Sequence, residues 1–146
     1  MGWSTGKRIA VATAIAGTLD IAMASFETWQ KGKPVSGMLG GVASGPFPGA
    51  AEWTAAPLAG LAVHFVLMAI IATVFIVARD RIALLRAYPI TSAALYGFGV
   101  WLVMYGIVLH QRFGVPFPSS DPIAIAKQLF AHVILVGVTI GMVARK

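Results

Sequence analysis

The sequence predicts an all-α membrane protein, built as an up-down-up-down bundle of four transmembrane helices with a short interfacial helix in the first outer loop. Four apolar stretches, at 9–29, 56–78, 89–109 and 122–143, each reach the about 20 residues that a helix needs to cross the hydrocarbon core. Hydrophobic residues make up 58% of the chain and charged residues 11%, against about 25% charged residues in a soluble domain. A soluble fold of 146 residues has no room to bury so much apolar surface, so we expect one transmembrane domain over 1–146.

The first apolar stretch, 9–29, has two interpretations. Basic residues precede it, and Ala22-Met23-Ala24 is typical of a signal-peptide cleavage site. Asp20 lies within the stretch, however, and an acidic residue is unusual in the apolar region of a signal peptide. We therefore interpret 9–29 as the first spanning helix.

The outer loop, 30–55, contains a shorter helical pattern. Its apolar residues have the spacing of one helical face, at Val35, Met38, Leu39, Val42 and Ala43. Pro34 precedes the pattern and Gly45-Pro46 follows it, as is typical of the two ends of a helix. The pattern predicts a short helix that lies in the membrane interface.

The remaining connections are short, at 79–88 and 110–121. Helices joined by short links are usually antiparallel neighbours, which predicts the up-down order of the bundle. Asp121 stands directly before Pro122, a pairing typical of a helix N-cap and the first helical position. The fourth helix is therefore expected to begin at Pro122.

Basic residues flank the apolar stretches and predict the orientation. One side carries Lys7, Arg8, Arg79, Arg81, Arg86, Arg145 and Lys146. The other side carries fewer: Lys31, Lys33, Arg112 and Lys127. The positive-inside rule then places both termini in the cytoplasm of a bacterial inner (plasma) membrane, with Trp29 and Trp53 at the outer interface and Tyr88 at the inner one.

The same flanking positions account for the net charge of +6 and the pI of about 10.2. Nucleic acid is not an expected partner, because no basic groove with stacking aromatic residues is evident. The chain contains no cysteine, and its serines lie in loops outside any nucleophile motif. We therefore expect a protein that is not an enzyme, with the lipid bilayer as its first partner.

Three ionisable residues fall inside the apolar stretches at one predicted depth. Asp20 lies nine residues before Trp29, His64 eight residues after Ala56, and His132 ten residues after Pro122. At about 1.5 Å of rise per residue, all three lie roughly 12–15 Å below the outer surface. Ionisable groups in a bilayer usually face the bundle interior and mark a functional site.

Four interpretations of this set remain open. Asp20, His64 and His132 either fix the helix register through hydrogen bonds or form a proton- or ligand-binding site that opens outward, with Glu27 and Tyr105 nearer the mouth. Two histidines and one carboxylate also match the ligand set of a metal site. A haem or chlorophyll-type pigment needs only one axial histidine, and Gly60 before His64 offers room for a flat ring.

Several short segments resemble small bacterial four-helix inner-membrane proteins, and the chain is similar to the YagU-like family of unknown function. The segments are Gly17-Thr18-Leu19-Asp20, Val42-Ala43-Ser44-Gly45, Leu61-Ala62-Val63-His64-Phe65, Tyr96-Gly97, Val103-Met104 and Leu129-Phe130-Ala131-His132. The resemblance implies a four-helix bundle and transfers no catalytic residue.

The first functional hypothesis is a non-enzymatic accessory or structural subunit of a membrane assembly, present as a homo-oligomer or within a larger complex. Glycine- and alanine-rich helix faces support it, because small residues let membrane helices approach closely. The second hypothesis is a small ligand- or proton-handling membrane protein that uses the Asp/His cluster. The third is a subunit that binds haem, a chlorophyll-type pigment or a metal.

Overall fold

A computed structural model describes residues 2–146, and within that range the chain forms helices and turns but no strand. Four helices of 23 to 26 residues are long and apolar enough to cross a membrane. The first two are α1 (Thr5–Gln30) and α3 (Ala56–Arg81). The third consists of α5 (Pro89–Val103), η2 (Met104–Leu109) and α6 (His110–Phe113), and the fourth of α7 (Pro122–Leu129), η3 (Phe130–Val138) and α8 (Thr139–Ala144). Shorter elements are α2 (Val35–Ser44), η1 (Ala50–Glu52) and α4 (Ala83–Ala87).

The four predicted apolar stretches are confirmed as helices, and each lies wholly inside one of them. The observed helices extend up to four residues beyond the predicted bounds. Asp121 caps α7 as expected: its side chain accepts a hydrogen bond from the backbone N–H of Ile123 at 2.9 Å. The helix predicted in the outer loop is present as α2.

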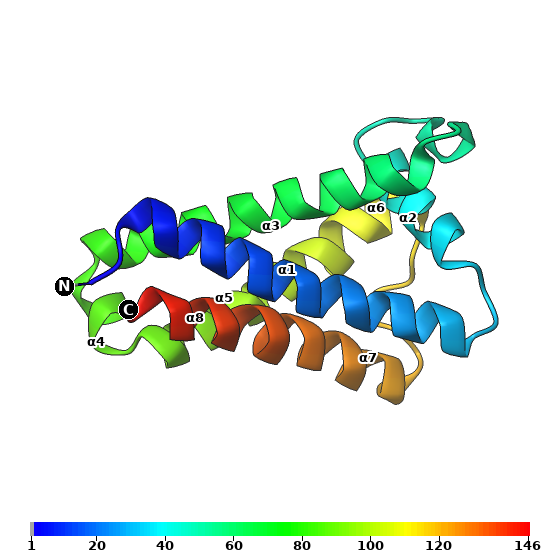
Figure 1. Ribbon diagram of the computed structural model, residues 1–146. Helices are drawn as coiled ribbons and strands as arrows, with labels where there is room; N and C mark the ends of the chain where they lie inside the picture. Colours follow the sequence, from blue (N-terminus) through cyan, green and yellow to red (C-terminus); the bar gives the residue numbers. More distant parts are fainter. Residues whose placement is uncertain (1) are drawn as a thin grey trace.

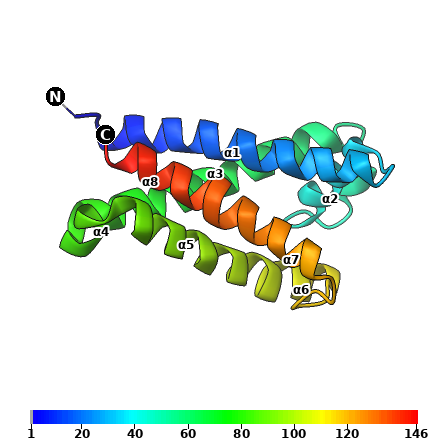
Figure 2. The ribbon, with the colours of Figure 1, turned by 90° about the horizontal axis from the view of Figure 1, so that it is seen from below.

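Both chain termini and α4 lie at one end of the bundle, and α2 and α6 lie at the other (Figure 1). Helix α1 packs against α3 on one side and against η3 and α8 on the other. Helix α5 packs against η3 and α8, whereas α3 and α5 make few direct contacts (Figure 2). The fourth helix therefore lies between the first and the third.

Small residues bring the backbones of α5 and the fourth helix into contact. A Cβ added to Gly137 would lie 2.5 Å from the carbonyl oxygen of Ala93, and one added to Gly97 would collide with the carbonyl oxygen of His132. Such close approach maximises van der Waals contact, which drives helix association where lipid is as apolar as the side chains. The glycine- and alanine-rich faces of these two helices therefore allow close packing, as expected from the sequence.

Helix α2 packs tightly against the start of α3. The carbonyl oxygen of Leu39 occupies the place where a Cβ on Gly60 would lie. At the other end of α2, Arg112 donates from Nη2 to the carbonyl of Ser44 at 2.9 Å and from Nε to the carbonyl of Gly45 at 3.1 Å. Helix α2 is thus attached to both the second and the third long helices.

Two of the long helices contain π-helical segments, η2 and η3, which the sequence did not predict. A π-helical segment widens the helix locally and rotates the side chains that follow it, and such segments are frequent at functional sites. Tyr105 lies in η2 and His132 in η3. Both segments therefore carry residues that the sequence had singled out.

Candidate functional site

A small cavity in the middle of the bundle brings the predicted Asp/His cluster together. Asp20 of α1, His64 of α3 and His132 of η3 all line this cavity, whose volume is about 50 Å³. The rest of the lining is apolar: Leu67, Met68, Ile71, Val100, Met104 and Val136. A space of this size holds one or a few water molecules and is far below the roughly 300–1,000 Å³ of small-molecule pockets.

Asp20 belongs to a polar stripe along α1 that faces the interior. Thr13 and Glu27 lie seven residues before and after it, and each has a buried oxygen without a hydrogen-bond partner in the described part of the chain. Gly17 lies on the same stripe and is fully packed, since a Cβ there would lie 2.8 Å from the Phe65 ring. The stripe is inward-facing, as the sequence pattern indicated.

His64 is held by a backbone carbonyl of the neighbouring helix. The residue is buried, with an exposed fraction of 8%, and its Nε2 lies 2.9 Å from the carbonyl oxygen of Gly17. A carbonyl oxygen only accepts hydrogen bonds, so Nε2 must carry a hydrogen. The other ring nitrogen, Nδ1, lies 4.0 Å from Oδ2 of Asp20.

This geometry places the Asp20 carboxylate opposite a ring nitrogen of His64. With the hydrogen of His64 fixed on Nε2, a neutral ring presents an unprotonated Nδ1 to the Asp20 carboxylate, and both groups are then acceptors. One proton on either group turns the pair into donor and acceptor. At the observed 4.0 Å the two atoms are too far apart for a direct hydrogen bond, so a bridging water molecule or a small side-chain movement would have to join them.

In His132 the roles of the two ring nitrogens are reversed relative to His64. Its Nδ1 lies 3.0 Å from the carbonyl oxygen of Gln128, so Nδ1 carries the hydrogen and Nε2 of the neutral ring is an acceptor. The ring meets Tyr105 edge-on, with 5.6 Å between the ring centroids. Gln128 in turn accepts a hydrogen bond at 3.2 Å from Nε1 of Trp101. His132 therefore connects the cavity with Tyr105.

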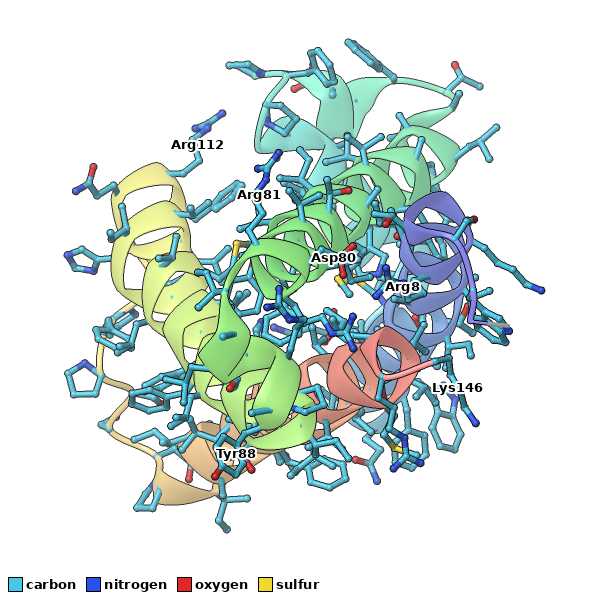
Figure 3. All side chains as sticks on the ribbon, turned by 90° about the vertical axis from the view of Figure 1, so that its left-hand side faces the viewer. Arg8, Asp80, Arg81, Tyr88, Arg112 and Lys146 are labelled. Carbon is cyan, nitrogen blue, oxygen red and sulfur yellow. The ribbon has the colours of Figure 1, made fainter. Side chains whose placement is uncertain are left out.

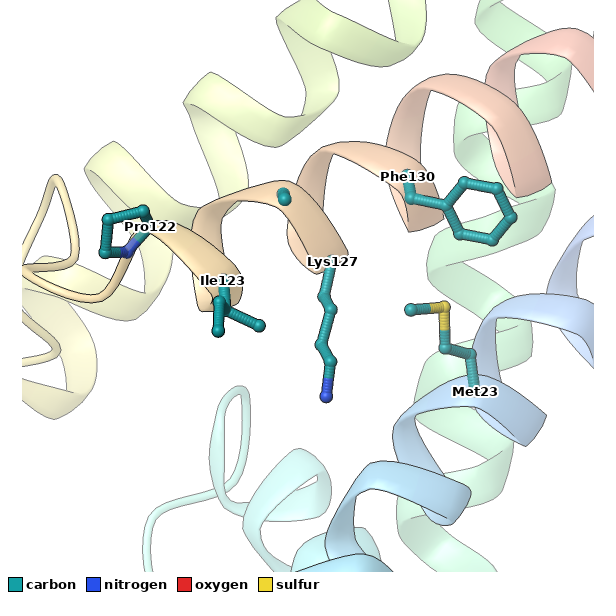
Figure 4. A pocket seen from close by; sticks show the side chains of 6 residues that line it. Met23, Pro122, Ile123, Lys127 and Phe130 are labelled. Carbon is teal, nitrogen blue, oxygen red and sulfur yellow. The ribbon is translucent and has the colours of Figure 1, made fainter.

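Glu27 pairs with a lysine further along the bundle. Nζ of Lys127 lies 3.7 Å from Oε1 of Glu27, which is an ion pair without a direct hydrogen bond. Lys127 reaches this position across a shallow apolar groove between α7 and α1, with Met23 and Phe130 beside it (Figure 4). The predicted mouth residues, Glu27 and Tyr105, thus lie between the cavity and the end of the bundle that carries α2 and α6.

The geometry gives little support to a metal or a tetrapyrrole. Within residues 2–146 no three His, Cys, Asp or Glu side chains are placed to hold one metal ion. Both nitrogens of His64 face protein groups, and the backbone of Leu39 fills the space beside Gly60 that a flat ring would need. His132 lines a cavity that is too small for such a ring.

A second polar cluster, which the sequence did not predict, lies at the end of the bundle where the chain termini meet. Arg8 donates to both carboxylate oxygens of Asp80, at 3.0 and 2.8 Å, and to the carbonyl of Ala144 at 3.2 Å. Thr5 donates to the same carboxylate at 2.8 Å. Figure 3 shows Arg8 and Asp80 directed toward each other between α1 and α3. This cluster ties together the first, second and fourth long helices.

A signal for this cluster was present in the sequence. Asp80 is a single acidic residue between Arg79 and Arg81, where the positive-inside rule explains only the arginines. Arg79 also donates to the Asp80 carboxylate, at 3.1 Å, and Arg86 donates to its backbone carbonyl at 2.9 Å. A lone acid in a basic flank thus indicates a partner, which here is mainly Arg8.

The fold defines the class of this protein as a multi-pass helical protein with four spans suited to a membrane. Comparisons with protein-family models, with curated proteins and with solved structures found no match.

Proposed function

We propose that this protein is a small, non-enzymatic, proton-handling protein of the bacterial inner membrane. The observation that carries the proposal is the pairing of Asp20 with His64, in which two acceptors face each other at 4.0 Å while the other ring nitrogen is held by Gly17. Carboxylates and imidazoles inside a membrane bundle are the side chains from which proton relays are built.

The proposal includes a topology. The four helices cross the membrane up-down-up-down with both termini in the cytoplasm, and α2 lies in the outer interface. The flanking basic residues and the exposed rings of Trp29 and Trp53 support this orientation. Protons then enter from the outer side, past Glu27 and Tyr105, to His132 and the Asp20–His64 pair. They leave toward the inner side along the face of α1 that carries the Thr13 hydroxyl, which has no hydrogen-bond partner within residues 2–146.

Proton flux into liposomes tests the function. Purified protein is reconstituted with a trapped pH-sensitive dye, and a potassium diffusion potential supplies the driving force. We expect dye acidification with the wild type and its loss in Asp20→Asn and in His64→Gln. Asp121→Asn and His110→Gln are matched controls, because both residues are exposed and lie away from the cavity. Equal flux in all five proteins would refute the proposal.

Labelling of single cysteines tests the topology, since the natural chain contains none. Lys146→Cys and Ser120→Cys lie at exposed positions outside the long helices. A membrane-impermeant maleimide added to intact spheroplasts is expected to label Ser120→Cys and to spare Lys146→Cys until the membrane is opened. The reverse pattern would contradict a cytoplasmic location of the termini.

A second proposal is an accessory role in a larger membrane assembly or a homo-oligomer. Most of residues 2–146 lie in the four long helices, so a partner would meet this protein mainly within the bilayer. The resemblance to the YagU-like family is compatible with this role and stays a proposal. Crosslinking in the native membrane, followed by purification, is expected to retain a fixed partner or a second copy, and a lone monomer would count against it.

A further inference from the structure

An apolar groove lies between α3 and the third long helix. Its volume is about 590 Å³, and its lining includes Val42, Val63, Leu67, Ile107, Val108 and Phe113. The groove exists because α3 and α5 make few direct contacts while each packs against other helices. Leu67, Ile107 and Val108 are 38%, 52% and 40% exposed, so the groove opens sideways, toward the surface that faces lipid in a membrane.

One end of the groove carries a cation held in a fixed position. The side chains of Gln111 and Arg112 line this end. The guanidinium of Arg112 lies 5.3 Å from the Phe113 ring and donates two hydrogen bonds to the carbonyls of Ser44 and Gly45. Arginine has five N–H donors, so these two bonds leave three for another acceptor.

Arg112 lies at a level suited to lipid headgroups. It belongs to the last turn of the third span, at the end of the bundle where α2 also lies (Figure 1). Trp29, in the last turn of α1, and Trp53, directly after η1, lie near the same end and are 68% and 51% exposed. Tryptophan is enriched at the membrane–water boundary, where phosphate groups of lipids are found.

We propose that this groove is a binding site for a phospholipid, with the lipid phosphate at Arg112 and one acyl chain along the groove toward Leu67. Arginine is well suited to this contact because its planar guanidinium offers two parallel donors to a phosphate. The apolar walls of the groove match an acyl chain, and the volume of the groove is within the usual range of ligand pockets. The groove shares Leu67 and Met104 with the Asp20 cavity, but neither Asp20 nor His64 lines it.

Spin-labelled lipids test the site. The protein is reconstituted in phosphatidylcholine vesicles that contain a trace of phosphatidylglycerol labelled on its acyl chain, and electron paramagnetic resonance measures the immobilised fraction. The comparison probe is diacylglycerol with the same label and no phosphate. We expect a larger immobilised fraction for phosphatidylglycerol. Arg112→Gln should reduce it to the diacylglycerol level, and Val108→Trp should reduce the immobilised fraction of both probes by filling the groove.

Val108→Trp tests the groove separately from Arg112, and Leu95→Trp serves as its control. Val108→Trp is preferred over changes at Leu67 or Met104, which also line the Asp20 cavity. It leaves Arg112 untouched, so it remains informative if Arg112→Gln disturbs α2. The matched control is Leu95→Trp, at a 69% exposed position on α5 that does not line the groove. It should leave both fractions unchanged.

Other occupants would give different results. If phosphatidylglycerol and diacylglycerol were immobilised equally in the wild type, the phosphate contact would be absent and the proposal wrong. If Val108→Trp converted a wild-type dimer into a monomer in light scattering, the groove would be an interface between two copies. That result would also overturn the lipid proposal.

Discussion

Arg8 and Asp80 join α1 to α3 through two contacts between the guanidinium and the carboxylate, at 3.0 and 2.8 Å. The same two helices also carry the pair of Asp20 and His64, with the acid now on α1 and the base on α3. Asp20 lies 12 residues beyond Arg8 (20 − 8), or about 18 Å along the helix axis. The interface between α1 and α3 therefore holds the Arg8–Asp80 ion pair near the termini and the Asp20–His64 pair deeper in the bundle.

Loss of the Asp80 carboxylate should destabilise the protein strongly. Arg8 is 7% exposed, so Asp80→Ala leaves a buried guanidinium without its counter-charge, at a cost of about 3–5 kcal/mol. Unfolding by increasing SDS in mixed micelles, followed by circular dichroism, measures the change. Arg81→Ala is the matched control, since Arg81 is exposed and its loss should change the free energy of unfolding by less than about 0.5 kcal/mol. Equal effects of both changes would contradict the assigned role of Asp80.

Gly60→Ala should separate α2 from α3. The new methyl group would collide with the carbonyl oxygen of Leu39, and a backbone atom has little freedom to move away. Overpacking of this kind costs about 1–3 kcal/mol. Gly41→Ala on α2 is the control, because no atom lies within 4 Å of its added Cβ and alanine favours the helix by about 0.5–1 kcal/mol. The same SDS titration compares the two, and a stabilised Gly60→Ala would show that α2 does not pack as described.

Gly97→Ala should disturb the cavity without changing any ionisable group. Its methyl group would collide with the carbonyl of His132 and push η3 away from α5. We expect lower stability and a loss of proton flux that resembles the effect of an Asp20 change. Gly99→Ala on the same helix has open space and serves as the control. Normal flux in Gly97→Ala, at unchanged protein level, would show that the position of His132 is unimportant for proton movement.

The two intramembrane histidines should have opposite tautomers. His64 donates from Nε2 to Gly17, and His132 donates from Nδ1 to Gln128, because backbone carbonyls only accept. Solid-state NMR of protein with ¹⁵N-labelled histidine distinguishes the two ring nitrogens when the rings are neutral. His64→Gln and His132→Gln, compared one at a time, assign the signals. Identical tautomers at both positions would contradict the hydrogen bonds on which the proton site rests.

Periodicity and composition were enough to predict the four long helices and the short α2. Apolar length defines a spanning helix almost without tertiary information, because each helix satisfies its own backbone hydrogen bonds. The spacing from the helix ends also predicted that Asp20, His64 and His132 lie near one another, and all three line one cavity. This prediction was possible because the rise per residue is constant and each helix has an identifiable outer end.

The sequence did not predict the π-helical segments η2 and η3, or the partner of Asp80. A π-helical turn depends on packing against neighbouring helices and leaves no strong pattern in the residues. Arg8 and Asp80 are 72 positions apart, so only the folded chain brings them together. The suggestion of open space beside Gly60 was also wrong, because the backbone of Leu39 fills it.

The sequence by itself therefore determined the four long apolar helices and their approximate extent, and the positions of the polar residues along them, since these follow from local hydrogen bonding and helix length. Only the tertiary structure decided that Nδ1 of His64 faces Asp20 and that Nε2 lies against the carbonyl oxygen of Gly17. Those contacts depend on the rotation of α1 against α3, and that rotation is set by side-chain packing between helices, such as the seating of Phe65 against Gly17.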